Sequence, residues 1–94
     1  MFLLITYDVS TIDKAGTRRL RRIAQACEDY GQRVQKSVFE CKLDQREWAL
    51  LRGRLLKEMD GDQDSLRFYF LEADTTPEHF GIKRPVDLED PLVF

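Results

Sequence analysis

The sequence predicts a single α+β domain in which two helices pack on one face of a β-sheet. Three observations support this fold class: apolar runs bounded by turn residues, two segments with apolar residues at helical spacing, and a β-rich segment between those helices. A chain of 94 residues forms one small domain. Such a domain buries only roughly 60–65% of its unfolded surface, so a partner subunit is an expected source of stability.

The first strand is predicted at Phe2–Tyr7, an apolar run that stops at Asp8. Because the run does not alternate with polar residues, we expect a central strand that is covered on both faces. A turn rich in capping residues then leads into a helix over roughly Ala15–Tyr30. One apolar stripe of this helix is formed by Leu20, Ile23, Ala24 and Cys27. Gly31 is expected to end the helix in a left-handed conformation.

The segment Gln32–Leu43 is β-rich, but neither of its faces is plainly apolar. A reversal near Gln35–Ser37 would divide it into two short strands. A second helix follows, for which Asp44 is a good N-cap, Glu47 completes a capping box, and Leu43 is positioned to pack on Trp48. Its apolar residues at helical spacing are Trp48, Leu51, Leu55 and Met59, and Gly61 is expected to end it.

The last predicted strand of the core is Ser65–Leu71, which has apolar or aromatic residues on both faces. The complete order is then β-α-β-β-α-β, the ferredoxin-like arrangement, over a core of residues 1–72. Residues 73–94 form a C-terminal tail or strand of the same domain, and either Val86–Leu88 or Leu92–Phe94 should pack on a sheet edge. Because both helices lie on one face of such a sheet, a homodimer with sheets packed face to face would cover the other face.

The charge is unevenly distributed along the chain, although the formal net charge is only −2. Residues 1–42 carry eight basic and five acidic side chains, whereas residues 43–94 carry seven and twelve. The basic residues that we consider for nucleic-acid binding are Arg18, Arg19, Arg21, Arg22, Arg33 and Lys36. The four arginines of the first helix either form an ordinary solvated face or bind phosphate oxygens, for which the planar guanidinium is well suited.

Two further features limit where the protein acts. No segment approaches the roughly 20 apolar residues of a membrane span, and the apolar N-terminal run is too short for a signal peptide. The two cysteines, Cys27 and Cys41, provide neither a disulfide framework nor a zinc-binding pair. We therefore expect a cytoplasmic protein with no membrane partner.

Asp8 is the candidate catalytic and metal-binding residue. A carboxylate at the end of a strand can hold a hard cation such as Mg²⁺, which prefers oxygen ligands, or it can simply cap a turn. One carboxylate is a poor metal site, whereas two Asp8 side chains that face each other across a dimer axis would be a better one. The single histidine, His79, has no cysteine or serine nearby and supports no catalytic triad.

The sequence resembles the CRISPR-associated protein two family, which supplies the small non-integrase subunit of the spacer-acquisition complex. Three segments carry the resemblance: Leu3–Val9, the arginine-rich helix that ends at Glu28–Gly31, and Arg33–Cys41. The resemblance implies a ferredoxin-like homodimer whose C-terminal strand can cross to the partner subunit. It also implies binding to DNA or RNA, and a heterocomplex with the CRISPR integrase.

The resemblance further implies an Mg²⁺-dependent endonuclease in which Asp8 is the metal ligand. Basic residues of the first helix and Arg33 would contact nucleic acid, and Phe39 would support the dimer sheet or the wall of the site. Two hypotheses follow. The first is a metal-dependent nuclease that hydrolyses phosphodiester bonds, and the second is a non-catalytic DNA-binding scaffold that spaces integrase dimers. We favour the scaffold as the essential role, with nuclease activity implied by the family.

Overall fold

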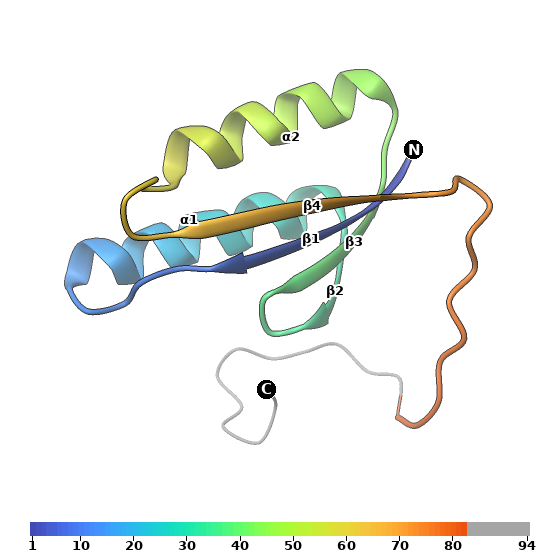
Figure 1. Ribbon diagram of the computed structural model, residues 1–94, viewed down its shortest axis with the longest axis horizontal. Helices are drawn as coiled ribbons and strands as arrows, with labels where there is room; N and C mark the ends of the chain where they lie inside the picture. The colour runs from blue at the N-terminus through green and yellow to red at the C-terminus, as the bar shows by residue number, and fades with distance from the viewer. Residues whose placement is uncertain (83–94) are drawn as a thin grey trace.

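The computed structural model describes residues 1–82 and confirms the order β-α-β-β-α-β (Figure 1). The elements are β1 (Phe2–Asp8), α1 (Lys14–Tyr30), β2 (Gln32–Gln35), β3 (Val38–Lys42), α2 (Gln45–Glu58) and β4 (Ser65–Leu71). After β4, the chain runs without helix or strand to residue 82 (orange in Figure 1). The expected packing of Val86–Leu88 or Leu92–Phe94 on a sheet edge lies outside the described residues.

The four strands form one antiparallel sheet in the order β2-β3-β1-β4. The central strand β1 pairs with β3 on one side and β4 on the other, so that Ile5 lies between Phe39 and Phe68. The expected central position of the first strand is therefore confirmed. The side chains of Leu3, Ile5 and Tyr7 join one core with residues from both helices, which places α1 and α2 on the same face of the sheet.

The helices bury the apolar stripes that the sequence predicts. Ile23 and Cys27 of α1 and Leu51 and Leu55 of α2 are fully buried. The capping box of α2 is present, because the Asp44 carboxylate accepts from the Glu47 N–H at 2.7 Å and the Glu47 carboxylate accepts from the Asp44 N–H at 3.0 Å. Neither helix within residues 1–82 is long and apolar enough to cross a membrane.

The structure corrects how the first helix ends. Gly31 caps α1 in an extended conformation, with φ −151° and ψ −167°, and not in the left-handed region. A Cβ atom at this position would lie 2.3 Å from the Cys41 sulfur and 2.6 Å from the Glu40 carbonyl oxygen. Glycine is therefore required because β3 passes too closely for any side chain.

The structure also corrects the end of the second helix. The last residue of α2 is Glu58, so Gly61 does not terminate it. The Asp60 N–H donates to the Asp64 carboxylate at 2.8 Å and not to a helical carbonyl, and the Asp64 N–H donates back to the Asp60 carbonyl at 2.8 Å. The helix ends earlier because the backbone at Met59 is already extended, with φ −73° and ψ 151°.

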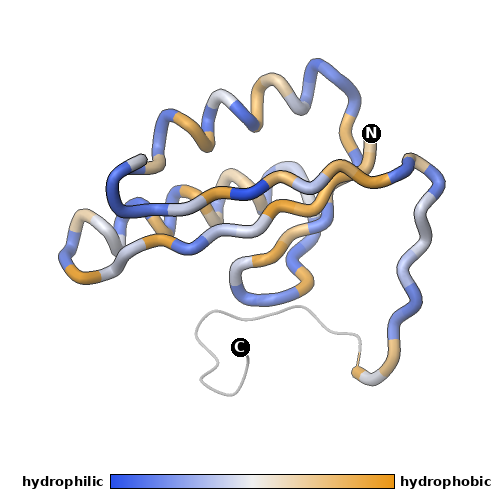
Figure 2. The backbone as a smooth tube through the Cα atoms, viewed as in Figure 1, coloured by the Kyte–Doolittle hydropathy of each residue, from blue (hydrophilic) through white to orange (hydrophobic). Residues whose placement is uncertain are grey.

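The face of the sheet opposite the helices has an apolar end and a polar end. Alternation along β1 places Phe2, Leu4, Thr6 and Asp8 on this face. The strand is hydrophobic near the N-terminus and becomes hydrophilic toward its other end (Figure 2). Leu71 lies opposite Phe2, and Ser65 lies opposite Asp8. Apolar residues therefore occur on both faces, as expected, but on the open face they do not extend to the end at Asp8 and Ser65. The cover of this face by a second copy stays a prediction.

Candidate active site and nucleic-acid interface

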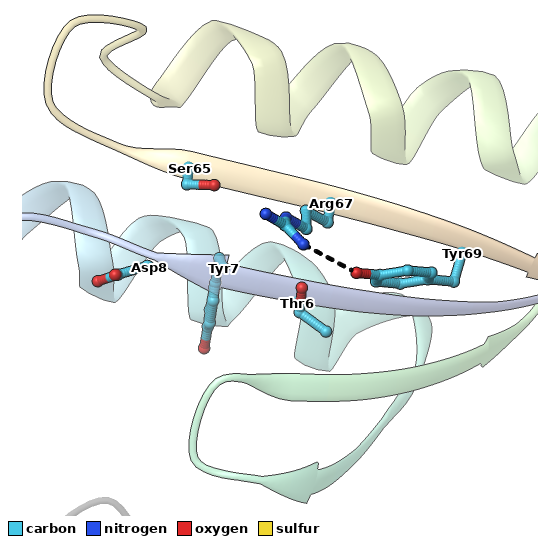
Figure 3. Close-up of a pocket in the computed structure, with 6 residues that line it drawn as sticks. All are labelled: Thr6, Tyr7, Asp8, Ser65, Arg67 and Tyr69. Atoms are coloured by element: carbon cyan, nitrogen blue, oxygen red, sulfur yellow. Dashed lines mark hydrogen bonds between the residues drawn. The ribbon is translucent and has the colours of Figure 1, made fainter.

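Asp8 lies at the polar end of the open sheet face, where β1 ends. Its carboxylate is exposed, and it pairs in register with Ser65 of β4. The two residues border a pocket of about 290 Å³, whose lining side chains are drawn in Figure 3. The full lining is Thr6, Tyr7, Asp8, Ser65, Arg67 and Tyr69. The predicted site residue is therefore placed in a polar pocket.

The described part of the chain gives the pocket oxygen ligands that suit a hard cation, but only one carboxylate. Mg²⁺ typically binds proteins through one or two carboxylates and keeps several waters. Asp8 supplies one such ligand, and the hydroxyl groups of Thr6 and Ser65 line the same pocket. Within residues 1–82, no three carboxylate, thiol or imidazole groups come together as a metal site. The oxygen atoms of these residues would suit Mg²⁺, but a single carboxylate is a poor metal site, so a shared Mg²⁺ stays a prediction.

Arg67 also lines the pocket, although it was not among the predicted site residues. Its guanidinium donates to the Tyr69 hydroxyl at 3.2 Å (dashed line in Figure 3). Among the ion pairs found in the described part of the chain, none involves Arg67. The signal in the sequence was its alternation with Phe68 and Phe70. Both rings contact Trp48 of α2, which leaves Arg67 on the opposite face.

The loop that follows Asp8 is fixed by the buried carboxylate of Asp64, another residue that the sequence analysis missed. The Asp64 side chain is fully buried. It accepts hydrogen bonds from the Ser10 N–H at 3.1 Å and from the Asp60 N–H at 2.8 Å. The Arg19 guanidinium donates to both carboxylate oxygens and holds the pKa of Asp64 below its usual value. Asp64 therefore joins the β1–α1 loop to the α2–β4 loop.

Gly16 brings the same loop close to the start of α1. A Cβ atom on Gly16 would lie 1.9 Å from the Ser10 carbonyl oxygen, so no side chain fits there. The Gly16 N–H donates to the Asp13 carboxylate at 2.8 Å, which caps the helix. The backbone after Asp8 is thus held by α1 on one side and by Asp64 on the other.

The four arginines of α1 separate into two groups. Arg19 is engaged by Asp64 at 2.8 Å and is mostly buried. Arg18, Arg21 and Arg22 are exposed, and their i, i+3, i+4 spacing places them on one side of the helix. Arg22 lies 3.7 Å from Glu58, a loose surface pair. Three guanidinium groups therefore remain available to solvent, while the fourth stabilises the fold.

Arg33 is held in place by three contacts. Its guanidinium lies 2.6 Å from the Glu28 carboxylate, donates to the Lys36 carbonyl, and stacks over the Phe39 ring at 4.6 Å. Only 6% of its side chain is exposed. The Lys36 side chain, in the turn between β2 and β3, is exposed. Of these two predicted nucleic-acid contacts, Lys36 is the accessible one and Arg33 is built into the structure.

Phe39 is fully buried on the helix-facing side of the sheet. It does not line the pocket, but its ring meets the Tyr7 ring edge-on at 6.1 Å, and Tyr7 does line it. Burial raises the pKa of the Tyr7 hydroxyl to about 12, so this group stays protonated at neutral pH. Phe39 therefore packs against Tyr7 on the helix-facing side of the sheet, and its role in the wall of the site stays a prediction.

Known proteins are similar to this chain in sequence over nearly its whole length. A profile of the CRISPR associated protein Cas2 family matches residues 1–77, which include every helix and strand described above. The chain is 58% identical over 95 residues to the CRISPR-associated endoribonuclease Cas2 of Nitratidesulfovibrio vulgaris, covering 99% of this chain and 93% of the relative. It is 51% identical to the CRISPR-associated endonuclease Cas2 of Halalkalibacterium halodurans, covering 100% of each chain.

The fold is similar to that of a solved structure as well. The crystal structure of Streptococcus pyogenes Cas2 at pH 6.5 superimposes with a TM-score of 0.72 at 49% sequence identity. The match covers 79% of this chain and 89% of that one. Sequence and fold comparisons therefore lead to the same family.

Proposed function

This chain belongs to the CRISPR associated protein Cas2 family, and on that premise we propose that it acts in CRISPR adaptation as a nuclease centred on Asp8. The observation that carries the proposal is the exposed Asp8 carboxylate on the border of a polar pocket. Relatives that align with nearly the whole chain carry the names endoribonuclease and endonuclease. The proposed reaction is hydrolysis of a phosphodiester bond in RNA or DNA.

The proposed site is completed by a second copy of the chain. In a homodimer with the open sheet faces together, two Asp8 carboxylates would hold one Mg²⁺ between them. When bound, Mg²⁺ stabilises negative charge on a phosphate and lowers the pKa of water. The protein's own part is to present the two carboxylates at fixed positions, which the Asp64 contacts with Ser10 and Arg19 support.

The exposed arginines of α1 would bind the nucleic-acid backbone. Arg18, Arg21 and Arg22 share one side of the helix, and phosphate contacts of this kind position a nucleic acid without reading its sequence. Among residues 1–82 of one chain, no histidine and no second carboxylate line the Asp8 pocket. Within this site, proton transfer therefore depends on water and on the opposing Asp8.

The direct test compares Asp8→Ala with the wild-type protein on labelled RNA and duplex DNA in Mg²⁺. We expect the variant to lose cleavage while it keeps its fold and its binding of nucleic acid. Asp62→Ala is the matched control, because Asp62 is an exposed acid in the α2–β4 loop that does not line the pocket. Equal cleavage by Asp8→Ala and wild type would assign the activity to another site or to a contaminant.

A second candidate function is a non-catalytic scaffold that binds duplex DNA and partners the CRISPR integrase. The single carboxylate per pocket and the separate group of exposed arginines favour it. Here we expect the triple variant Arg18→Glu, Arg21→Glu and Arg22→Glu to abolish duplex binding while Arg19 preserves the fold. If the triple variant bound duplex DNA as tightly as the wild type at low salt, these arginines would not be the DNA-binding surface, because electrostatic binding must weaken when cations are lost.

A further inference from the structure

We propose that Arg67 is the phosphate-binding residue of the Asp8 pocket. Its ligand would be a non-bridging oxygen of the phosphodiester that lies beside Asp8. The proposal deepens the nuclease function and rests on it for the identity of the ligand as nucleic acid. It adds a binding residue on β4, far along the chain from the basic residues of α1.

The sheet register places Arg67 and Asp8 as diagonal neighbours. Asp8 lies opposite Ser65, Thr6 lies opposite Arg67, and all four residues belong to the same open face. Diagonal pairs in an antiparallel sheet are separated by about 7–8 Å between backbone positions. Both side chains border the same pocket (Figure 3), so a phosphate group that enters it would lie between a carboxylate and a guanidinium.

Within residues 1–82, no carboxylate forms an ion pair with Arg67. Arg19, Arg33 and Arg54 each meet a carboxylate at 2.6–2.8 Å, whereas no such pair involves Arg67 within residues 1–82. Its one hydrogen bond in this part of the structure goes to the Tyr69 hydroxyl, a neutral acceptor on the same strand. That bond orients the guanidinium along the pocket and leaves its other N–H donors free for a bidentate contact with phosphate.

The pocket therefore has complementary halves. A carboxylate attracts a cation and repels phosphate, so nucleic acid would approach Asp8 only with help from positive charge. Arg67 supplies such a charge on the same face, without the ion pairing that fixes Arg19 and Arg33 in the fold. We infer that Arg67 offsets the repulsion between Asp8 and the backbone of the substrate.

The test measures binding of a labelled single-stranded RNA oligonucleotide by fluorescence anisotropy, in Ca²⁺ and over a series of NaCl concentrations. We expect Arg67→Gln to weaken binding about fivefold to tenfold and to reduce the slope of log K against log salt by about 0.7, the value for one lost contact to a single strand. Arg67→Lys should restore the slope, because it keeps the charge. Arg46→Gln, an exposed arginine of α2, should leave both quantities unchanged.

Several outcomes would overturn the proposal. An unchanged salt slope in Arg67→Gln would show that no phosphate contact was lost, and an equal loss in Arg46→Gln would show only general electrostatic attraction. A changed oligomeric state of Arg67→Gln in sedimentation would assign the guanidinium to subunit contact. The proposed nuclease function fails in a different experiment, if Asp8→Ala still cleaves nucleic acid. That result would not affect the salt dependence of RNA binding, which tests the role of Arg67 separately.

Discussion

The Arg19 guanidinium and the Asp64 carboxylate form a two-point ion pair, with N···O distances of 2.8 and 3.2 Å. The pair joins α1 to the loop before β4, across 45 residues of sequence. Because Asp64 also binds the Ser10 N–H, it fixes the backbone two residues after Asp8. The same contact therefore contributes to stability and to the geometry of the proposed active site.

Replacement of Asp64 by alanine should lower the stability of the protein and disturb the geometry of the proposed active site. The change leaves the Arg19 guanidinium and the N–H groups of Ser10 and Asp60 without their acceptor. We expect a loss of roughly 1–3 kcal/mol in the free energy of unfolding, measured in urea, and reduced cleavage under conditions where the variant is folded. Asp62→Ala is the control, since Asp62 is exposed. Unchanged stability in Asp64→Ala would show that the ion pair does not hold the loops together.

The Asp64 ion pair should also give stability that depends on acid pH. The pKa of Asp64 is lowered in the folded state by Arg19 and by backbone N–H groups, whereas an unfolded aspartate titrates near pH 3.9, roughly its ordinary value. The contribution is therefore complete above the unfolded pKa and is lost as the pH falls through the folded pKa. The difference in unfolding free energy between wild type and Asp64→Asn should shrink between about pH 5 and pH 2. A constant difference across that range would contradict the assigned cause.

The capping box at Asp44 and Glu47 shows what the sequence could predict, because its partners lie three residues apart. Asp8, likewise, was identified by its position at the end of an apolar run. Asp64 was not, because it resembles any acid in a polar loop, and its importance comes from contacts with residues that are distant in sequence. Arg19 could not be told from its neighbours until the direction in which each arginine points was known.

The close approach of β3 to Gly31 could not be predicted from the sequence. It leads us to expect that replacement by alanine lowers stability at Gly31 but raises it at Gly53. Gly31→Ala should destabilise the protein by roughly 1–3 kcal/mol, because a Cβ atom would meet the Glu40 carbonyl and the Cys41 sulfur. Gly53→Ala, in α2, meets no atom within 4 Å and should stabilise it by up to about 1 kcal/mol. Thermal unfolding of the two variants measures both effects. The loss caused by Gly31→Ala should be smaller, but still present, when it is measured in a Cys41→Ala background, since the Glu40 oxygen remains. Complete disappearance of the loss in that background would contradict this explanation.

The two thiols should be unreactive in the folded protein. Cys27 and Cys41 are fully buried, and burial raises the pKa of Cys27 to about 12 and that of Cys41 to about 11. Since the thiolate is the reactive form, we expect reaction with an aromatic disulfide reagent at pH 8 to be at least about a hundredfold slower than in denaturant. The release of coloured thiolate measures the rate. Rapid native reaction of either cysteine would show that the core opens readily at β3 or α1.

The dimer on which the proposed metal site depends can be tested at Leu4, in the middle of the open sheet face. Leu4 lies opposite Glu40 in β3, so Leu4→Lys gains an acidic neighbour and should leave the single subunit folded. In a face-to-face dimer, however, the same lysine would be buried against apolar residues, at a cost of several kcal/mol and an increase of at least about a hundredfold in the dimer dissociation constant. Leu50→Lys, at a 55% exposed leucine of α2, should leave that constant unchanged. Sedimentation equilibrium distinguishes the two. If Leu4→Lys remains as tightly dimeric as the wild type, the subunits do not meet through this face, and two Asp8 carboxylates cannot share a cation in the way proposed.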